Sequence, residues 1–551
     1  PTPETPKEEK KEEDNSPPPP LQIDLEGIQH RIEPFPLKEA NYTQIWAIPG
    51  KVLLSHRPIL GSLDQSWYNG SEPPAHATLE VFDLQTQKTK TFPFTITHFK
   101  ATKDGKKLIY QAGYKLRVVD AEPAENDSPT QEPGPESGFL DLNRLKVEVI
   151  PEVEWQQMFE EIWRLQLHHF WVEDMSGVDW HQVKKRYRPL LPRVASRSEF
   201  SDLIWEMQGE LGTSHAYELG GDYRKGPQYK QGFLGAEFRF DPDKQTYRIE
   251  KILQGDPWQE DYASPLQRIG VNAKPGDYLI AINGQPLHKD FSPAQALVHQ
   301  ANQEVELTLE QNGQQRTVPV KTTGSEFPIR YRDWVENNRN YVLQKTKNRV
   351  GYLHIPDMGP RGYAEFHRYY LAELEKDALI VDVRYNRGGH VSQLLLEKLA
   401  RKRLGFDLPR WGQPEPYPAD SVLGPLVAIT NEYAGSDGDI FSHCFKLMKL
   451  GKLVGKRTWG GVIGIWPRHK LVDGSITTQP EFSFWFVDVG WKVENHGADP
   501  DVEVEITPQD WAQYKDPQLD AAIEILLKEL EENPPQLPKF DNKPNLALPF
   551  S

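Results

Sequence analysis

Cysteine is almost absent from this chain, which has a single one among its 551 residues, so no disulfide can form within it. A chain without internal disulfides is typical of a reducing compartment, and we therefore expect a cytoplasmic protein. Cys444 lies on the apolar face of a predicted helix, where a free cysteine usually belongs to the core. We interpret it as a core residue and not as a nucleophile.

Long apolar runs are also missing. No run approaches the ~20 residues that a membrane-spanning helix needs, and the N-terminus lacks the apolar segment of a secretory signal. We therefore expect no contact with a membrane. The first residue is Pro1 and not methionine, so we expect a trimmed chain or a portion of a longer one, which leaves an upstream signal open.

Positive charge is in deficit, with 64 Lys and Arg against 80 Asp and Glu and a net charge of -16. This balance argues against a nucleic-acid partner or an anionic membrane. The glycine-rich signatures of phosphate-binding loops are absent, and His168-His169 lacks the Glu-x-x-His spacing of a zinc helix. We expect no metal and no cofactor.

The N-terminal quarter is first polar and then rich in short strands. Residues 1–20 are mostly Pro, Glu and Lys and predict a disordered linker. Residues 21–145 alternate in the manner of antiparallel sheet, and the two similar runs 79–83 and 116–120 both end in Asp. Such repeats are typical of terminal β-propeller blades, here too few to close a ring. A second polar linker is expected over 121–137.

Residues 146–228 have helical periodicity and predict a helical domain. Apolar residues recur three and four apart from Trp155 to Leu165 and again from Phe200 to Met207. The second helix is expected to end near Gly212, which places His215 just beyond a helix C-terminus. A histidine there is exposed enough to act in catalysis, and it fits a capping residue equally well.

Residues 229–322 predict a third, mainly β unit. It opens with a Gly-Phe-Leu-Gly loop at 232–235 and contains the strand and Asn-Gly turn of 274–284. Both features resemble a PDZ domain, and the loop resembles its carboxylate-binding loop. PDZ domains bind extended peptides by strand addition. A working groove and a degenerate packing module both remain open.

Residues 323–532 alternate strands and helices, which predicts an α/β domain on a largely parallel or mixed sheet. The Gly388-Gly389 turn and Ser436 each follow a predicted strand, and ligand sites in such sheets lie at the carboxyl ends of strands. The tail over 533–551 is proline-rich and predicted to be extended. The expected fold class is thus multidomain α+β, with partial β-propeller blades, a helical domain, a PDZ domain and an α/β (mixed-sheet) catalytic domain.

Ser436 lies in the Gly- and Asp-rich turn 431–439, between a buried strand at 426–430 and a helix predicted over 440–450 with Asp439 as its N-cap. Glycines let the backbone approach a ligand, and the helix N-terminus favours a developing negative charge. A serine nucleophile beside an oxyanion hole would be placed in such a turn. A turn that binds nothing has the same pattern.

A serine nucleophile needs a base and an oxyanion hole. The backbone N–H groups of Gly389 and Asp437 could form the hole. Sequence spacing alone leaves the base open among His215, His390, His443 and His496.

Four motifs, at residues 209–218, 431–439, 458–464 and 493–501, resemble those of the tricorn protease family, within the clan of tail-specific, C-terminal-processing serine peptidases. The resemblance follows nearly the whole chain in order. It departs at the front, where tricorn proteases carry a six-bladed propeller and most of a seven-bladed one upstream. It implies a serine endopeptidase that cleaves oligopeptides, such as proteasome-type products, into short peptides.

The resemblance also implies roles for individual residues. Ser436 would be the nucleophile and His215 the base, with Ser214 and Glu494 orienting His215. Gly389 and Asp437 would form the oxyanion hole. Asp407 would lie in the S1 pocket of a neighbouring subunit and favour basic P1 residues, which implies a homo-oligomer, a hexamer in this family.

Two alternatives belong to other functional classes. A non-catalytic scaffold could bind peptides through the PDZ and propeller units. An esterase or amidase could use the same serine, although the Gly-x-Ser-x-Gly elbow of many such enzymes is absent.

Overall fold

The computed structural model describes residues 23–32, 34–59, 75–123, 134–256, 258–259, 262–535 and 538–548. The linker predicted over 1–20 and most of the one predicted over 121–137 lie outside the described residues. The chain forms two compact units, Pro1–Leu60 with Asn69–Lys146 and Gly61–Tyr68 with Val147–Ser551.

The first unit contains two antiparallel sheets, as the alternating pattern predicts. One has the order β1-β2-β3-β4 and the other the order β5-β6-β7. Their strands are β1 Asn41–Ile48, β2 Lys51–Arg57, β3 Ala77–Asp83, β4 Lys88–Ile96, β5 His98–Ala101, β6 Lys107–Ala112 and β7 Lys115–Asp120. Leu53, Leu79 and Leu108 are fully buried in a shared core. The assignment of these sheets to propeller blades stays a prediction.

The second unit begins with three helices, α1 Pro151–His169, α2 Trp180–Tyr187 and α3 Arg197–Gly209. The apolar faces of α1 and α3 pack together through Phe159, Ile162 and Phe200, which are fully buried. Helix α2 was not predicted. After α3, the short strand β8 Glu218–Leu219 pairs with β22 Ile476–Thr477. This pairing joins the segment that carries His215 to a much later part of the chain.

The PDZ-like unit is an antiparallel sheet of order β14-β13-β11-β10-β9, with β12 paired to β11. The predicted Asn-Gly turn is present, since Asn283 and Gly284 both have positive φ. The elements are β9 Ala236–Asp241, β10 Thr246–Ile252, β11 Tyr278–Ile282, β12 Gln285–Pro286, α4 Pro293–Ala296, β13 Glu304–Gln311 and β14 Gln314–Lys321.

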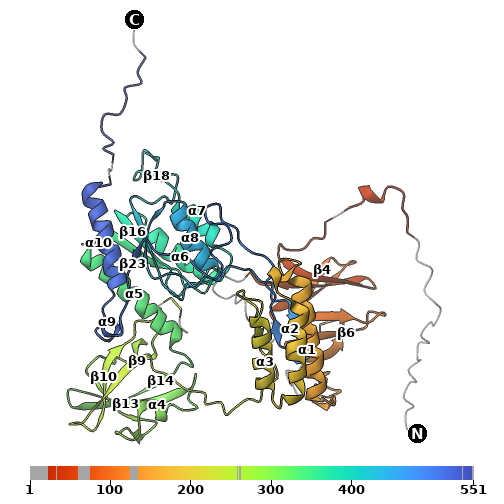
Figure 1. Cartoon of the computed structure of the whole chain (residues 1–551). Helices are drawn as coiled ribbons and strands as arrows, with labels where there is room; N and C mark the ends of the chain where they lie inside the picture. Colours follow the sequence, from red (N-terminus) through yellow and green to blue (C-terminus); the bar gives the residue numbers. More distant parts are fainter. Residues whose placement is uncertain are drawn as a thin grey trace, which may run out of the picture. The chain divides into compact units, whose positions relative to one another are not determined.

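The α/β region is built on a five-stranded sheet of order β15-β16-β19-β20-β23 (Figure 1). All four neighbouring pairs are parallel, so of the two predicted alternatives the largely parallel sheet is confirmed and the mixed sheet was wrong. Each crossover is long enough to return every strand in the same direction. The strands are β15 Val350–His354, β16 Ala378–Asp382, β19 Leu426–Thr430, β20 Gly451–Gly455 and β23 Val502–Glu503.

Helices cover both faces of this sheet. In Figure 1, α5 Phe327–Lys345 and α10 Pro517–Glu532 lie on one side, and α6 Pro360–Glu373, α7 Ser392–Leu399 and α8 Asp437–Leu447 on the other. The remaining elements are β17 Gly405–Asp407, β18 Glu415–Tyr417, β21 His469–Lys470 and α9 Pro508–Ala512. Strands β15, β16 and β19 are buried along their whole length, as expected for a sheet covered on both faces.

A buried charge network fixes the carboxyl end of β16. Asp382 Oδ2 accepts from Arg384 Nη2 at 2.7 Å and from the Tyr352 hydroxyl at 2.8 Å, and Arg384 also contacts Asp516 at 2.8 Å. Because these charges are paired inside the protein, the chain leaving β16 has one well-defined path. That path leads directly to the Gly388-Gly389 turn.

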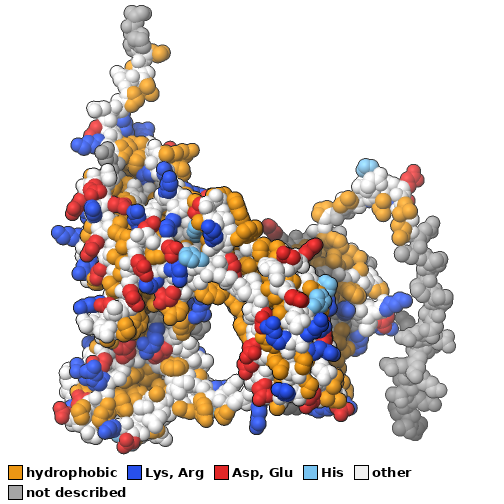
Figure 2. Space-filling view, viewed as in Figure 1, with side chains coloured by type: hydrophobic (Ala, Val, Ile, Leu, Met, Phe, Trp, Pro, Cys, Tyr) orange, Lys and Arg blue, Asp and Glu red, His pale blue; other side chains and the backbone are white. Residues whose placement is uncertain are grey.

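Charges of both signs are interspersed over the face shown in Figure 2, without a broad basic patch on that face. Within the described ranges, no helix has both the length and the apolar character that crossing a membrane requires.

Candidate active site

Ser436 lies at the sharp turn between β19 and α8. Helix α8 begins at Asp437 with Ser436 as its N-cap residue, so the predicted start at residue 440 with Asp439 as N-cap was wrong. Ser436 has φ 57° and ψ -121°, a conformation that costs free energy for any residue with a Cβ. Strain of this kind persists only where the surroundings hold the backbone, and it is common at functional sites.

The Gly388-Gly389 turn packs directly against Ser436. A Cβ added to Gly388 would lie 2.5 Å from the Ser436 Cβ, and one added to Gly389 would lie 2.0 Å from the Met358 carbonyl oxygen. Gly389 has φ 147° and Gly388 has φ 73°, so both positions need glycine. In the part of the chain that the structure describes, no acceptor bonds the backbone N–H of Gly389 or of Asp437. Both donors are therefore free for a bound oxygen.

Two polar side chains hold these turns together, that of Asp437 and that of Asn386, which the sequence did not single out. The Asn386 side-chain oxygen accepts from the Gly388 N–H at 2.9 Å, and the Asn386 carbonyl accepts from the Gly435 N–H at 3.0 Å. The carboxylate of Asp437 accepts from the Ser392 N–H at 3.0 Å. The spacing between the two free N–H groups is thus fixed by hydrogen bonds from both sides.

His215 is backed by a hydroxyl and a carboxylate. Its Nδ1 lies 2.8 Å from Ser214 Oγ, which lies 3.2 Å from Glu494 Oε2. An ionised carboxylate only accepts, so the Ser214 hydroxyl donates to Glu494 and accepts from the His215 Nδ1–H. This order of donors leaves the lone pair of His215 Nε2 available to take a proton.

The Glu494 carboxylate accepts hydrogen bonds from several segments of the chain, unlike an ordinary carboxylate in a surface turn. Besides the Ser214 hydroxyl, it accepts from the backbone N–H groups of Ser214 at 2.7 Å, Val462 at 2.7 Å and Ile463 at 3.1 Å. The loop around Val462 and the relay behind His215 are therefore held by the same group.

Asp439 holds the other side of that loop. Its carboxylate accepts from the Gly460 N–H at 2.7 Å and the Gly461 N–H at 3.2 Å. The side chain is fully buried, and burial raises its pKa to about 6. Asp439 thus points into a neighbouring loop and does not cap its own helix. The Ser436 helix and the Glu494 relay are joined through this loop.

The imidazole of His215 is nearly enclosed, with 8% of the residue exposed. Its ring meets Trp459 edge-on at 5.4 Å between centroids and Tyr217 at 5.5 Å. Burial lowers the pKa of His215, and the charge of Glu494 partly opposes that shift. The neutral form, which can act as a base, is favoured.

The lowered pKa of His215 predicts the pH dependence of any activity at this site. Protonation removes the base, so kcat/KM should stay level on acidification to about pH 6.5, the ordinary pKa of histidine, and fall only below it. A pH series of kcat/KM with a peptide reporter measures the midpoint. Asp439→Asn is the control for the second group that titrates nearby. A midpoint above the ordinary histidine pKa would contradict this account.

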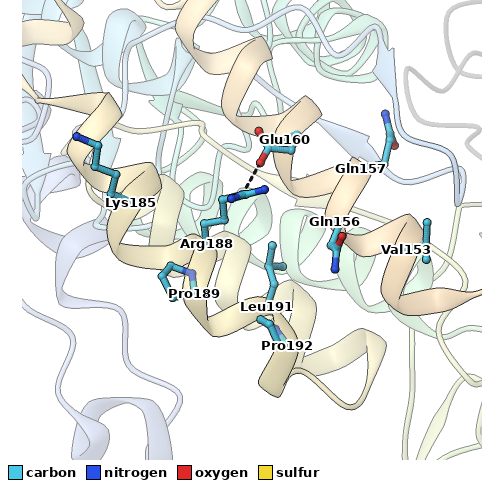
Figure 3. Close-up of a pocket in the computed structure, with 9 residues that line it drawn as sticks. All are labelled: Val153, Gln156, Gln157, Glu160, Lys185, Arg188, Pro189, Leu191 and Pro192. Atoms are coloured by element: carbon cyan, nitrogen blue, oxygen red, sulfur yellow. Dashed lines mark hydrogen bonds and ion pairs between the residues drawn. The ribbon is translucent and has the colours of Figure 1, made fainter.

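His215 and Ser436 line the same cavity, of about 480 Å³. Gly389, Arg387 and Glu432 also line it. A cavity of about 850 Å³ lies beside His443 and His496, and another of about 720 Å³ lies between α1 and the chain following α2 (Figure 3). In Figure 3 the Glu160–Arg188 pair lies across that last cavity. Among the described lining residues, neither of these cavities brings a serine to a histidine.

The other candidate histidines have different surroundings. His390 lines the cavity of Ser436 and stacks on Trp466. His443 lies 3.0 Å from Asp488, and His496 lies 2.9 Å from Asp499. In His215 the Nδ1 is backed first by a hydroxyl and then by a carboxylate, the arrangement that a catalytic base needs.

Asp407 lies elsewhere, at the exposed end of β17, where it faces Glu415 of β18. It is not among the described residues that line the cavity of Ser436. Cys444 packs beside the core, and burial raises the pKa of its thiol to about 11, which keeps it protonated. No group of three or more metal-ligating side chains occurs within the described ranges.

Comparison with known proteins places this geometry in a family. Family models match residues 151–209 as the tricorn protease C1 domain, 232–325 as the tricorn protease PDZ domain and 349–504 as peptidase family S41. The chain is also 43% identical over 521 residues to tricorn protease homolog 1 of Streptomyces coelicolor. The chain belongs to the tricorn protease family.

Other relatives agree with this assignment. The tricorn protease of Thermoplasma acidophilum is 38% identical over 94% of this chain, and a putative tricorn-like protease C-terminal subunit of Sulfurisphaera tokodaii is 44% identical over 93%. The crystal structure of the tricorn protease matches with a TM-score of 0.81 at 38% identity over 89% of this chain. The chain spans 48% of the Streptomyces relative, 47% of the Thermoplasma protein, 58% of the Sulfurisphaera subunit and 47% of the chain in the crystal structure.

Proposed function

We propose that this tricorn-family chain is a cytoplasmic serine endopeptidase that cleaves oligopeptides, such as proteasome-type products, into short peptides. One observation carries the proposal: Ser436 and His215 line the same cavity. Ser436 lies at a strained turn beside two free N–H groups, and Ser214 and Glu494 orient His215. These are the parts that acyl transfer through a serine requires.

The reaction follows from the donors and acceptors present. Ser436 Oγ attacks the peptide carbonyl carbon while His215 Nε2 takes the hydroxyl proton. The charge on the carbonyl oxygen is stabilised by the N–H groups of Gly389 and Asp437. His215 then donates its proton to the leaving amine, and the resulting ester on Ser436 is hydrolysed by water that His215 deprotonates.

Throughout the cycle the Ser214 hydroxyl and the Glu494 carboxylate keep the Nδ1–H of His215 pointing away from Ser436. They also stabilise the imidazolium that forms after each proton transfer. We assign them as positioning residues for the base, since neither touches the reacting atoms. We further propose that the sheets of residues 21–145 are propeller blades.

Asp407 is proposed to act in the S1 pocket of a neighbouring copy in a homo-oligomer, hexameric by family resemblance. Its exposed position and its absence from the cavity lining of its own chain support a role in trans. Leu408 and Trp411, close by in the chain, are also exposed, 44% and 84%, which suits a contact surface. A carboxylate there favours Lys or Arg at P1 through charge-assisted hydrogen bonds.

Reversing that charge should change specificity. We expect Asp407→Lys to lower kcat/KM for an Arg-P1 peptide by about 10²-fold, and for a Leu-P1 peptide by about twofold at most. Glu415→Lys is the matched control, since Glu415 pairs with Asp407 across the same hairpin. Equal losses on both peptides, or the same effect from Glu415→Lys, would assign Asp407 a structural role.

Mixing two variants tests whether Asp407 acts in the site of a neighbouring subunit. Copies with Asp407→Lys keep a complete catalytic set, and copies with Ser436→Ala keep Asp407. The Ser436→Ala form is inactive and the Asp407→Lys form is impaired. Oligomers that contain both should regain Arg-P1 cleavage if Asp407 of one subunit acts in the site of its neighbour. No gain on mixing would mean that Asp407 acts within its own chain or not at all.

A further inference from the structure

The carboxylate-binding loop of the PDZ domain already holds a carboxylate. The Gly235 N–H, in the loop of residues 232–235, donates to Glu326 Oε1 at 2.9 Å. Gly235 has φ 68°, and a Cβ there would lie 2.6 Å from Ser264 Oγ, so only glycine presents its N–H in this way. The Glu326 side chain is 12% exposed. The contact is therefore largely shielded from water.

The segment that carries Glu326 pairs with the loop as a short strand. The Phe233 N–H donates to the Thr323 carbonyl at 2.9 Å, and the Thr323 N–H donates to the Phe233 carbonyl at 3.0 Å. This is an antiparallel bridge. A peptide bound to a PDZ domain adds a strand and places its terminal carboxylate on the loop. Residues 323–326 supply both contacts from within the chain.

Glu326 belongs to the neighbouring domain and is held there. The PDZ match ends at residue 325, and Glu326 is the N-cap residue of α5. Its second oxygen, Oε2, accepts from Arg330 Nε at 2.9 Å. A peptide terminus that displaced Glu326 would leave Arg330 with only the more distant Glu237, at 3.4 Å, among the acidic partners in the described chain.

Further contacts fasten α5 to the PDZ domain. Asp333 of α5 accepts from Lys251 Nζ at 2.5 Å and from the Gln254 N–H at 2.9 Å. Arg332 Nη2 of α5 lies 3.6 Å from the Asp256 carboxylate of the PDZ domain, which also accepts from Arg368 Nη1 of the neighbouring helix α6 at 2.5 Å. Glu326 is thus one of several charged contacts across the same boundary, and the only one of these that uses the loop.

We propose that Glu326 is the resident ligand of the PDZ loop, and that the loop anchors the PDZ domain to helix α5 in place of receiving the carboxyl terminus of a peptide. The loop remains a carboxylate site, with a side-chain carboxylate of the same chain as its occupant. Removing that carboxylate should open the loop to a terminal carboxylate from solution.

The experiment measures binding of two labelled peptides by fluorescence anisotropy. Both are the same hexapeptide with an apolar last residue, one with a free carboxyl terminus and one amidated. The protein is the full chain with Ser436→Ala, so that the peptides are not cut and the result does not depend on catalysis. The compared variants are Glu326→Ala, Glu326→Gln and the control Glu237→Gln, which removes a carboxylate beside the same arginine without touching the loop.

With Glu326 present, we expect the two peptides to bind equally weakly, and Glu237→Gln to leave that result unchanged. Glu326→Ala should bind the free-carboxyl peptide about tenfold more tightly than the amidated one. Hydrogen exchange at the Gly235 amide should quicken in Glu326→Gln, which reports on the contact even if Glu326→Ala folds poorly. A carboxyl preference with Glu326 present, or no change in Gly235 exchange on its replacement, would overturn the proposal.

Discussion

Replacing Ser436 with alanine should lower the kcat of peptide cleavage by about 10⁶-fold, or to the detection limit. In the proposed mechanism the hydroxyl oxygen forms the covalent intermediate, and alanine occupies the same turn without a nucleophile. Residual turnover would come only from the oxyanion donors acting on water. Steady-state cleavage of an Arg-P1 reporter by purified protein measures the loss.

Two comparisons make that result specific. Ser442→Ala removes a hydroxyl from the same helix, where it donates to the Gly438 carbonyl at 2.8 Å, and should keep activity within about twofold. His215→Ala should cost about as much as Ser436→Ala, and the double variant little more, because the two groups act as one unit. Additive losses would mean that His215 does not serve Ser436.

Glu494→Gln should give the second-largest effect, a loss of about 10⁴-fold in kcat with little change in KM. The glutamine amide nitrogen cannot accept a hydrogen bond, although each Glu494 oxygen accepts at least one. The Ser214 hydroxyl would lose its charged acceptor, and His215 would lose the orientation of its Nδ1–H.

The effect of Glu494 on the base can be separated from its effect on the fold. Glu494 raises the pKa of His215 against burial, so Glu494→Gln should move the acid midpoint of the residual activity to lower pH. A simply misfolded loop would not shift that midpoint. Glu503→Gln, at an exposed pair with Lys456, is the control and should leave both rate and midpoint unchanged. A Glu494→Gln variant as active as the parent would remove Glu494 from the account.

Local chemistry made part of the site predictable. The apolar run of 426–430, the glycines around Ser436 and the glycine pair at 388–389 predict two sharp turns at the carboxyl ends of strands, and the structure has both. The start of α8 was misplaced because Asp439 satisfies the Gly460 and Gly461 N–H groups of another loop. Which N–H group a capping side chain chooses depends on tertiary contacts that spacing does not show.

Sequence spacing could not predict which distant segments come together to form the site. Ser214 and Glu494 are 280 residues apart, and the β8–β22 pairing that helps bring their segments together involves two-residue strands with no pattern of their own. Spacing therefore leaves four histidines as possible bases, and only the resemblance to a family implies His215. The occupant of the PDZ loop was hidden for the same reason, since Glu326 is 91 residues from Gly235 and outside the motif.

The proposed function requires that Ser436 is a nucleophile activated by His215. The most direct measurement is the intact mass of the full chain after reaction with a fluorophosphonate, followed by peptide mapping. We expect one adduct per chain, on Ser436, which forms neither in Ser436→Ala nor, at a comparable rate, in His215→Ala. An adduct on another residue, equal labelling of Ser436→Ala, or no labelling of the unaltered chain would contradict the account.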